Sequence, residues 1–419
     1  MSHFTSSRRE STSLQVSYLL AMGFLFIASP LCGAGFQLGE RSTTGLGRAF
    51  SGESVIGENA TILGSNPAGM SLLDDHSLAF GSSAILPSLD VSGTTPFGAA
   101  GDRDVIADAF ISYAYYSQKV NEQIHFGFGA YTTYGLESGY SETFANSAVV
   151  EFSTLRSVNL NPALSYKPGK QWTIGAGFNA LFAEGEISSR RPGVGTQLFQ
   201  LTGDDWGYGY NIGVLYEHSP ETRIGLHYRS SIDLALKGEA EIGTGFGAFP
   251  AGVLPASLTI ELPDSLELSL YHELDEQWAV HADILWTHWS QFEDFNPLVN
   301  PLIDDFLATR ENWNNTFRFA LGTTYQWSDS LTLRTGVAYD ESPVETLFRT
   351  LRIPDADRIW ASFGASYHLS KSYTIDLGYT HIFSSSVDIN RKPSGNEDTF
   401  QGSAGGDADL LSLGISGRF

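Results

Sequence analysis

From residue 76 to the end, apolar and polar residues alternate along this chain, and this pattern constrains the fold more than any other feature. One such segment alternates small or polar residues with Trp172, Ile174, Ala176, Phe178, Ala180 and Phe182. Beyond residue 33 there is no run of about 18 apolar residues of the kind that forms a spanning helix. Successive side chains of a β-strand point to opposite faces, so each segment predicts a strand with one apolar and one polar face.

The alternating segments predict fourteen strands and an all-β, antiparallel transmembrane barrel. Their ranges are 76–90, 104–118, 122–136, 151–167, 171–185, 204–217, 222–238, 256–274, 277–293, 312–327, 330–342, 356–370, 372–389 and 407–419. Short polar turns, such as 167–170 and 370–372, alternate with longer linkers at 137–150, 186–204, 242–256 and 294–312. Short turns at one end and long loops at the other are typical of a transmembrane barrel. A secreted β-sandwich is the alternative, because its strands also alternate.

The first 33 residues have the layout of a secretory signal peptide. Arg8 and Arg9 precede an apolar run at 18–27, and small residues follow it around Cys32. Cleavage is expected before Ala34 or Gly35. Cys32 is the only cysteine, so the exported chain would hold no disulfide. The formal net charge of −23 argues against nucleic acid as a partner.

Residues 34–75 do not alternate and are rich in Gly, Ser and Thr. The lumen of a fourteen-stranded barrel is too wide for wall side chains to fill. This segment therefore predicts an N-terminal hatch inside the lumen, followed by the barrel over 76–419. A barrel closes without a second subunit, which favours a monomer in contact with outer membrane lipid.

Three sets of residues resemble the FadL family of long-chain fatty acid transporters. The first comprises residues 34–38, 45–53 and the tripeptide Asn66, Pro67 and Ala68; the others are 262–267 with 286–292, and 353–358. The resemblance runs over nearly the whole exported chain. It implies a bacterial, Gram-negative outer membrane location and passive uptake of a long-chain fatty acid or another hydrophobic small molecule. The outer linkers 186–204 and 242–256 are shorter than in the best-known members.

Several apolar residues are candidates for ligand binding. Phe246, Phe249 and Leu254 belong to a linker that is unusually apolar for an exposed tip, and exposed apolar patches commonly bind ligands. Packing of this loop on the barrel rim or on lipopolysaccharide is the alternative. The resemblance implies that Phe36 and Leu38, near the start of the hatch, contact the ligand tail.

Two groups of small or turn-forming residues bear on passage through the barrel. Asn66, Pro67 and Ala68 predict a turn that seats the hatch against the wall. Gly127, Gly129 and Gly135 interrupt the third predicted strand, and glycine inside a strand often marks a bulge or a close backbone approach. The resemblance implies a kink there that opens a side passage; glycines that make room for the hatch are the alternative.

Charged residues also fall on faces assigned to the lumen: Arg229, Asp233, Glu267, Asp283, Arg318, Arg334, Asp340, Arg358 and Asp376. Their mixed signs predict pairing with each other or with Arg48, Glu53 and Glu58 of the hatch. Arg318 and Arg358 are the candidates for a fatty acid carboxylate, because a guanidinium can bind it bidentately. Aromatic residues near strand ends predict interfacial girdles: Trp172, Trp278, Trp286, Trp289, Trp327 and Tyr373.

Other functions remain open at this point. Uptake of aromatic or other small hydrophobic compounds is the main alternative, followed by a structural or receptor barrel and an outer-membrane lipase. The sequence has no zinc-protease helix, phosphate-binding loop or nucleophile elbow, so no enzyme activity, cofactor or metal is predicted.

Overall fold

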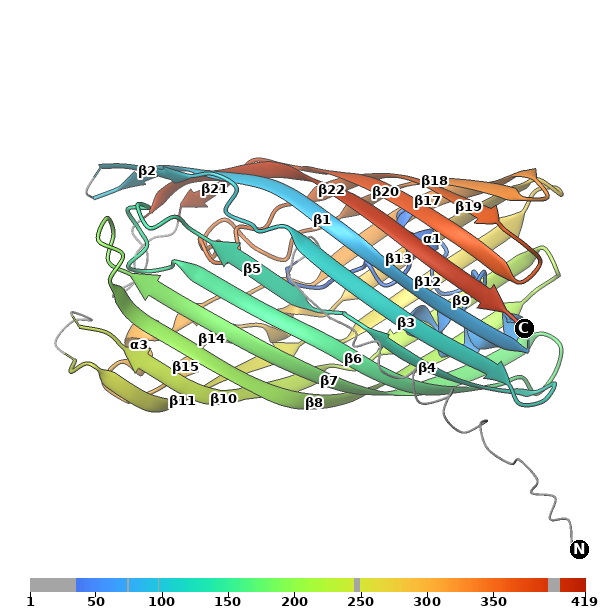
Figure 1. Cartoon of the computed structure of the whole chain (residues 1–419), viewed down its shortest axis with the longest axis horizontal. Helices are drawn as coiled ribbons and strands as arrows, with labels where there is room; N and C mark the ends of the chain where they lie inside the picture. The colour runs from blue at the N-terminus through green and yellow to red at the C-terminus, as the bar shows by residue number, and fades with distance from the viewer. Residues whose placement is uncertain (1–34, 74, 97, 245–248, 391–399) are drawn as a thin grey trace, which may run out of the picture.

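A closed antiparallel barrel of 14 strands surrounds the N-terminal part of the chain (Figure 1). This computed structural model describes residues 35–419, apart from 74, 97, 245–248 and 391–399. The last strand, β22 (Gln401–Arg418), pairs with the first, β1 (His76–Thr95), over nearly its whole length, which closes the wall. The predicted fold class is therefore confirmed. The predicted signal peptide, 1–33, lies outside the described residues.

Some wall strands are continuous and others are interrupted. The other continuous strands are β3 (Ala109–Lys119), β6 (Phe152–Tyr166), β7 (Trp172–Arg190), β8 (Gln197–Glu217), β13 (Trp278–Thr287), β17 (Thr316–Ser328), β18 (Leu331–Asp340) and β19 (Arg358–His368). The interrupted strands carry two labels each: β4 (Ile124–Tyr131) with β5 (Gly135–Gly139), β9 (Thr222–Arg229) with β10 (Ile232–Ile242), β11 (Gly252–Leu262) with β12 (Ser265–Glu273), and β20 (Tyr373–Ser384) with β21 (Val387–Asn390).

The connections differ in length between the two ends of the barrel. Short turns lie at the end that holds the C-terminus, and the longer loops lie at the opposite, extracellular end (Figure 1). Those loops contain β2 (Gly98–Asp102), η2 (Trp289–Gln291), β14 (Asp294–Phe295), β15 (Pro297–Leu298), α3 (Asp304–Leu307) and β16 (Thr309–Arg310). The predicted linker 186–204 is mostly strand: β7 and β8 leave only 191–196 between them, because their alternation continues above the lipid-facing band.

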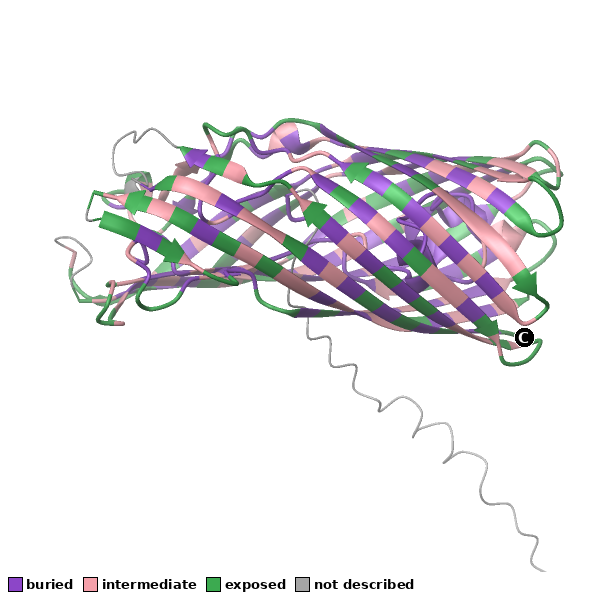
Figure 2. Ribbon diagram, turned by 90° about the horizontal axis from the view of Figure 1, so that it is seen from above, coloured by how far each residue is buried: buried purple, intermediate pink, exposed green. Residues whose placement is uncertain are grey.

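The outward face of the wall carries an apolar band around the barrel. Buried and exposed residues alternate along the strands (Figure 2). The exposed side chains include Phe126, Phe178, Tyr210, Leu268, Phe319, Phe363, Leu377 and Leu413. Such a band is the surface that a bilayer covers. Within the described part of the chain, we find no helix with the length and apolar character needed to cross a membrane.

The alternation changes phase where β9 meets β10 and where β11 meets β12. Arg229 and Ile232 are both buried although three positions separate them, and Leu262 and Ser265 repeat this relation on the neighbouring strand. An odd offset reverses which residues face inward, since the side-chain period of a strand is two. Asp233, expected in the lumen, is therefore exposed on the outer surface, and that prediction was wrong.

Residues 35–73, here called the N-terminal segment, lie inside the barrel. Three short helices shape it: α1 (Thr43–Leu46), α2 (Ile62–Ser65) and η1 (Pro67–Leu72). Wall side chains hold α1, where the Tyr113 hydroxyl donates to Thr43 Oγ1 at 2.7 Å. Gly47 packs directly on Gly364 of β19, and a Cβ on Gly47 would lie 2.7 Å from the Gly364 Cα. The N-terminal segment and the wall thus come into close backbone contact where both carry glycine.

Gly175 of β7 offers a test of this fit. A Cβ built on Gly175 collides with the backbone nitrogen of Ala68, whereas Gly169, in the turn before β7, has open space around it. We expect Gly175→Ala to destabilise the seated segment by about 1–3 kcal/mol, as overpacking does. Limited proteolysis of the N-terminal segment in the folded barrel measures the effect. Gly169→Ala is the matched control, and equal protease resistance in both variants would contradict the expected contact.

Candidate functional site

Above the phase change, the extracellular half of the lumen is lined by apolar side chains. β7, β8, β10 and β11 contribute most of them, including Leu181, Ile187, Leu201, Leu234, Leu236, Leu258, Ile260 and Leu262. Below the change, β9 and β12 present polar groups inward, namely His227, Arg229, Glu267 and Ser269. The phase change therefore converts a polar interior into an apolar one. We call the upper space the apolar chamber.

Phe36 of the N-terminal segment lies at the base of the apolar chamber inside a cage of aromatic rings. Its ring centroid lies 4.7 Å from that of Trp289, 5.4 Å from that of Phe292 and 5.6 Å from that of Trp313. Trp289 is fully buried in this cage, so its predicted place in an interfacial girdle was wrong. The short helix η2 after β13 turns it inward. Trp313 lies in a loop and was not identified from the sequence.

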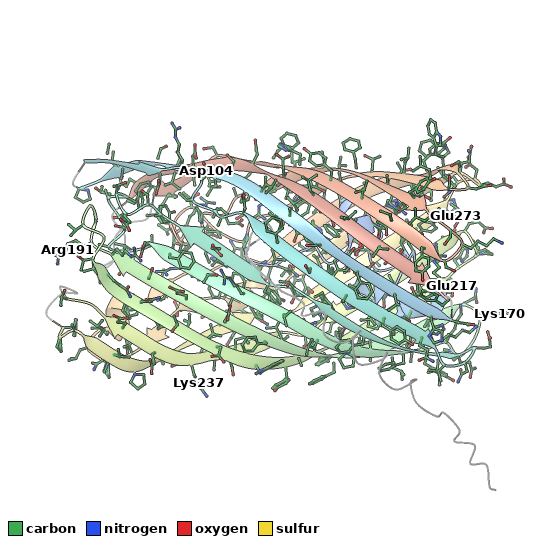
Figure 3. All side chains as sticks on the ribbon, in the orientation of Figure 1. Asp104, Lys170, Arg191, Glu217, Lys237 and Glu273 are labelled. Atoms are coloured by element: carbon green, nitrogen blue, oxygen red, sulfur yellow. The ribbon has the colours of Figure 1, made fainter. Side chains whose placement is uncertain are left out.

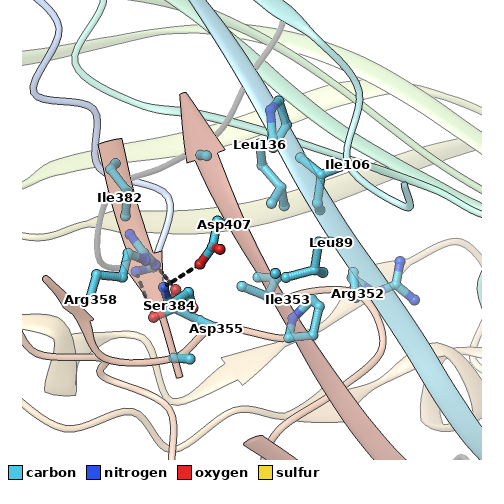
Figure 4. A pocket seen from close by; sticks show the side chains of 16 residues that line it. Leu89, Ile106, Leu136, Arg352, Ile353, Asp355, Arg358, Ile382, Ser384 and Asp407 are labelled. Carbon is cyan, nitrogen blue, oxygen red and sulfur yellow. Dashed lines mark hydrogen bonds and ion pairs between the residues drawn. The ribbon is translucent and has the colours of Figure 1, made fainter. Parts of the chain in front are cut away.

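Two narrow cavities, of about 50 and about 30 Å³, remain in the apolar chamber. Leu136, Arg352 and Ile353 line both of them, and Phe36 lines the smaller one. Figure 4 shows the larger cavity, with Arg352 and Arg358 on opposite sides of it. Pockets that hold drug-sized ligands usually measure about 300–1,000 Å³. Neither of these two cavities would hold a long ligand unless side chains such as Phe36 move.

The arginines in and near the chamber differ in their partners. Arg358 is ion-paired with Asp355 and lies 4.0 Å from an Asp340 oxygen. Arg318 lies 3.7 Å from Glu267 and lines a separate polar pocket together with Leu38. The two arginines expected to meet a carboxylate thus already face buried carboxylates of the protein.

Arg352 lies in the loop between β18 and β19, outside the alternating segments, so strand periodicity did not predict it. Its Nη1 donates to Ser153 Oγ at 3.1 Å, and its guanidinium lies 4.9 Å from the ring centroid of Phe295. Ser153 and Phe295 both line the smaller cavity. The only sequence signal was its position directly before residues 353–358, where the family resemblance is strong.

The remaining predicted ligand residues fall into three situations. Phe249 and Leu254 are partly buried and pack against the apolar chamber from above. Phe246 lies outside the described residues. Leu38 is buried in a different cluster, with Phe50 and Trp360, rather than in the chamber.

The Asn66, Pro67 and Ala68 tripeptide starts η1 against the wall. Asn66 Oδ1 accepts from the Ala68 N–H at 3.0 Å, and its Nδ2 donates to the carbonyls of Ser54 at 2.8 Å and Val214 at 3.2 Å. Val214 belongs to β8, so one side chain joins the turn, the segment and the wall. This arrangement agrees with a turn that docks the segment.

The third wall strand is interrupted at 132–134. Gly127 and Gly129 lie before this break in continuous β4, and Cβ atoms there would meet Leu63, Met70 and Tyr115, so both glycines make room for inward side chains. Gly135 opens β5 directly after the break. The N-terminal segment bonds at this point, since the Leu38 N–H donates to the Thr133 carbonyl at 2.8 Å and the Gly135 N–H to the Phe36 carbonyl at 2.9 Å.

Charges hold the lower part of the N-terminal segment. Glu58 pairs with Arg334 of β18 at 2.9 Å and with Arg48 at 3.3 Å, and Arg48 also pairs with Glu53 at 2.8 Å. Burial would raise the pKa of Glu58, but Arg334 and then Arg48 outweigh it and lower this pKa to about 2. The expected pairing between the segment and lumen charges is therefore present.

Glu40, in the same segment, has the opposite environment. Burial raises its pKa to about 7, and the neighbouring backbone amides, Arg318 and Arg41 offset this only in part. The folded state therefore holds a proton on Glu40 between pH of about 4.5 and 7 that the unfolded state has lost.

A closed barrel with an apolar outer band and its own N-terminal segment in the lumen defines a plugged bacterial outer-membrane barrel. The model of one protein family, described as outer membrane protein transport protein (OMPP1/FadL/TodX), matches residues 24–419. The chain belongs to this family.

Individual relatives agree with this assignment. The chain is 32% identical to the long-chain fatty acid transport protein of Escherichia coli K12, covering 89% of this chain and 93% of that protein. It is 30% identical to outer membrane protein P1 of Haemophilus influenzae, covering 87% and 89% respectively. Among solved structures, a Pseudomonas aeruginosa FadL homologue matches with a TM-score of 0.83 at 21% identity, covering 92% of this chain and 100% of that one. The Pseudomonas putida toluene transporter TodX matches with a TM-score of 0.67 at 18% identity, covering 94% and 99%.

The raised pKa of Glu40 predicts a pH-dependent stability. Because the folded-state pKa of Glu40 lies above the unfolded value, the contribution of Glu40 to stability is greatest below pH of about 4.5 and is lost as pH rises through about 7. Glu40→Gln removes this loss, so we expect it to raise the free energy of unfolding at pH 8 by up to about 3 kcal/mol and to change little at pH 4. Thermal unfolding in detergent at both pH values measures the difference. Glu276→Gln, in an exposed turn, is the control, and an unchanged pH slope in Glu40→Gln would contradict the prediction.

Proposed function

We propose that this protein takes up long-chain fatty acids across the outer membrane. The observation that carries the proposal is an apolar chamber whose two cavities meet at Arg352. A fatty acid needs an apolar lining for its tail and a cation or donors for its single carboxylate. The 32% identity to the long-chain fatty acid transport protein of Escherichia coli K12 supports fatty acids as the ligand.

Arg352 is the proposed partner of the carboxylate. Its side chain lines both cavities, and a guanidinium can bind a carboxylate bidentately through charge-assisted hydrogen bonds. Leu136 and Ile353, which line the cavities on both sides, would contact the tail.

The N-terminal segment acts as the hatch in this proposal. Phe36 fills the base of the apolar chamber, and its carbonyl accepts from Gly135 at the break in the third wall strand. Movement of Phe36 would enlarge the chamber and release this bond in one step. The hatch would therefore respond to ligand that arrives from the extracellular side.

The route has an extracellular start and a lateral exit. Phe249 and Leu254 form part of the capture surface above the chamber. Pairing of β3 with the third wall strand stops at Ala114↔Ala130, and the described ladders include none between β3 and β5. An apolar ligand would leave the barrel here and enter the lipid. The concentration gradient of the ligand would drive this movement, and a monomeric barrel would be sufficient for it.

A competition experiment tests the proposed function. A fluorescent fatty acid is bound to the delipidated barrel in detergent, and oleate and toluene are compared as competitors. We expect oleate alone to displace the probe. Displacement by toluene alone would assign the chain to hydrocarbon uptake, and absence of probe binding would favour a receptor barrel.

The role of Arg352 predicts a ligand-specific loss. Arg352→Ala removes a charge-assisted bond worth about 1.5–3 kcal/mol, so we expect oleate to bind at least about tenfold more weakly. Uncharged ligands would lose less, because they make no such bond. Probe displacement by oleate measures the effect, with Arg191→Ala in the exposed 191–196 loop as the control. Unchanged oleate affinity in Arg352→Ala would remove Arg352 from the site while leaving the competition result intact.

The role of Phe36 predicts faster ligand access. Phe36→Ala empties the aromatic cage, whereas Leu38→Ala opens a cavity of similar origin in a cluster outside the chamber. We expect Phe36→Ala to raise the rate of probe binding and Leu38→Ala to leave it unchanged, although both substitutions destabilise the segment. Stopped-flow binding measures this rate. Equal rates in the two variants would mean that Phe36 does not block the chamber.

A further inference from the structure

A hollow of about 470 Å³ on the outer surface of β6, β7, β8 and β10 is not used by the proposed transport route. Cross-strand pairing arranges the outward side chains around it in rows. At its lower edge, Val158 pairs with Phe182 and Phe182 with Trp206, whose ring centroids lie 5.3 Å apart. This row belongs to the apolar band, so the hollow begins at the level where the lipid-facing surface ends.

A charged row lies directly above the aromatic row. Arg156 pairs across the strands with Glu184, Glu184 with Asp204, and Asp204 with Lys237. The Arg156 guanidinium lies 3.9 Å from Glu184 and 3.3 Å from Glu137. Lys237 makes no ion pair with any residue that the structure describes, and Figure 3 shows it pointing away from the wall.

Three glycines in register separate this charged row from the next. Gly185 pairs with Gly203, and Gly203 pairs with Gly238. A Cβ on Gly238 would collide with the Thr202 carbonyl, so the strands approach too closely there for a side chain. Glycines often mark a bend within a strand, and a row of them on adjacent strands allows all three strands to bend at the same level. This bend accounts for the depression in the outer surface.

The row above the glycines supplies further acceptors. Thr154 pairs with Glu186, Glu186 with Thr202, and Thr202 with Glu239. The hollow is thus lined by carboxylates and hydroxyls, with two cations on its lower row. Carboxylates accept hydrogen bonds from hydroxyl groups, and Lys237 can donate to a phosphate as a point charge.

We propose that this hollow binds the phosphorylated saccharide headgroup of an outer-leaflet glycolipid. The occupant has to be amphiphilic, because the outward surface continues from an aromatic row, through a row of two cations and two carboxylates, to a row of carboxylates and hydroxyls. Acyl chains would lie along Phe182 and Trp206, the phosphate would contact Lys237, and sugar hydroxyls would donate to Glu184, Asp204 and Glu186. The surrounding carboxylates repel a bare phosphate, so the saccharide is needed for binding. This proposal does not depend on what the chamber transports.

A binding titration with lipopolysaccharide tests the proposal. The delipidated full-length barrel in detergent is titrated with purified lipopolysaccharide for wild type and Lys237→Glu. Lys170→Glu is the matched control, since Lys170 is exposed in a turn at the opposite end of the barrel (Figure 3). We expect Lys237→Glu to bind about fivefold more weakly, Lys170→Glu to match wild type, and Lys237→Arg to restore binding.

Soluble competitors identify which part of the lipid the hollow recognises. Glucosamine phosphate should compete for the wild-type barrel, whereas inorganic phosphate should not. Competition by inorganic phosphate, or equal weakening in Lys237→Glu and Lys170→Glu, would overturn the proposal. Binding of the fluorescent fatty acid to the same preparations reports the transport proposal separately, so failure of one is distinguishable from failure of the other.

Discussion

Everything in this molecule depends on the closed ladder of backbone hydrogen bonds around the barrel. Inside a bilayer no water can satisfy an open strand edge, and each unpaired backbone group costs several kcal/mol. The pairing of β1 with β22 removes that edge and fixes the register of the whole wall. Alternating sequence is the consequence, because each strand then has one face toward lipid and one toward the lumen.

Closure at this width creates the second problem, a lumen that wall side chains cannot fill. The N-terminal segment fills it, and the wall accommodates the segment at glycines such as Gly175 and Gly364. Tight backbone contact then needs polar partners, which Asn66 supplies through the Val214 carbonyl and Glu58 through Arg334. The N-terminal segment is therefore held both by close packing and by ion pairs. Among its described residues, Phe36 is the only large aromatic side chain in the apolar chamber.

The parts of this structure that follow from periodicity could be predicted, and the parts that follow from its interruption could not. Fourteen alternating segments and two kinds of connection were sufficient for the barrel. Asp233 was placed on the wrong face because Ser230 and Ser231 shift the alternation, so that the positions expected to face the lumen face outward beyond them. No particular residue type marks such a shift in the sequence. Trp289 and Arg352 were misjudged or missed for a related reason: both lie in irregular segments that turn back into the lumen, where strand parity carries no information.

The same phase change has consequences on both faces of the wall. Below it, Leu266 and Leu268 face lipid while Glu267 and Ser269 face the plug. Above it, Leu234 and Leu236 face inward while Asp233 and Lys237 face outward. On the two interrupted strands, β9 with β10 and β11 with β12, the same offset therefore ends the lipid-facing band and begins the apolar chamber. If the protein transports fatty acids as proposed, an apolar ligand can pass from the chamber directly into the bilayer, because no polar layer lies between them. Phe36 lies at that boundary and is bonded to the break in the third wall strand, which places the proposed hatch contact where chamber, lumen and lipid meet.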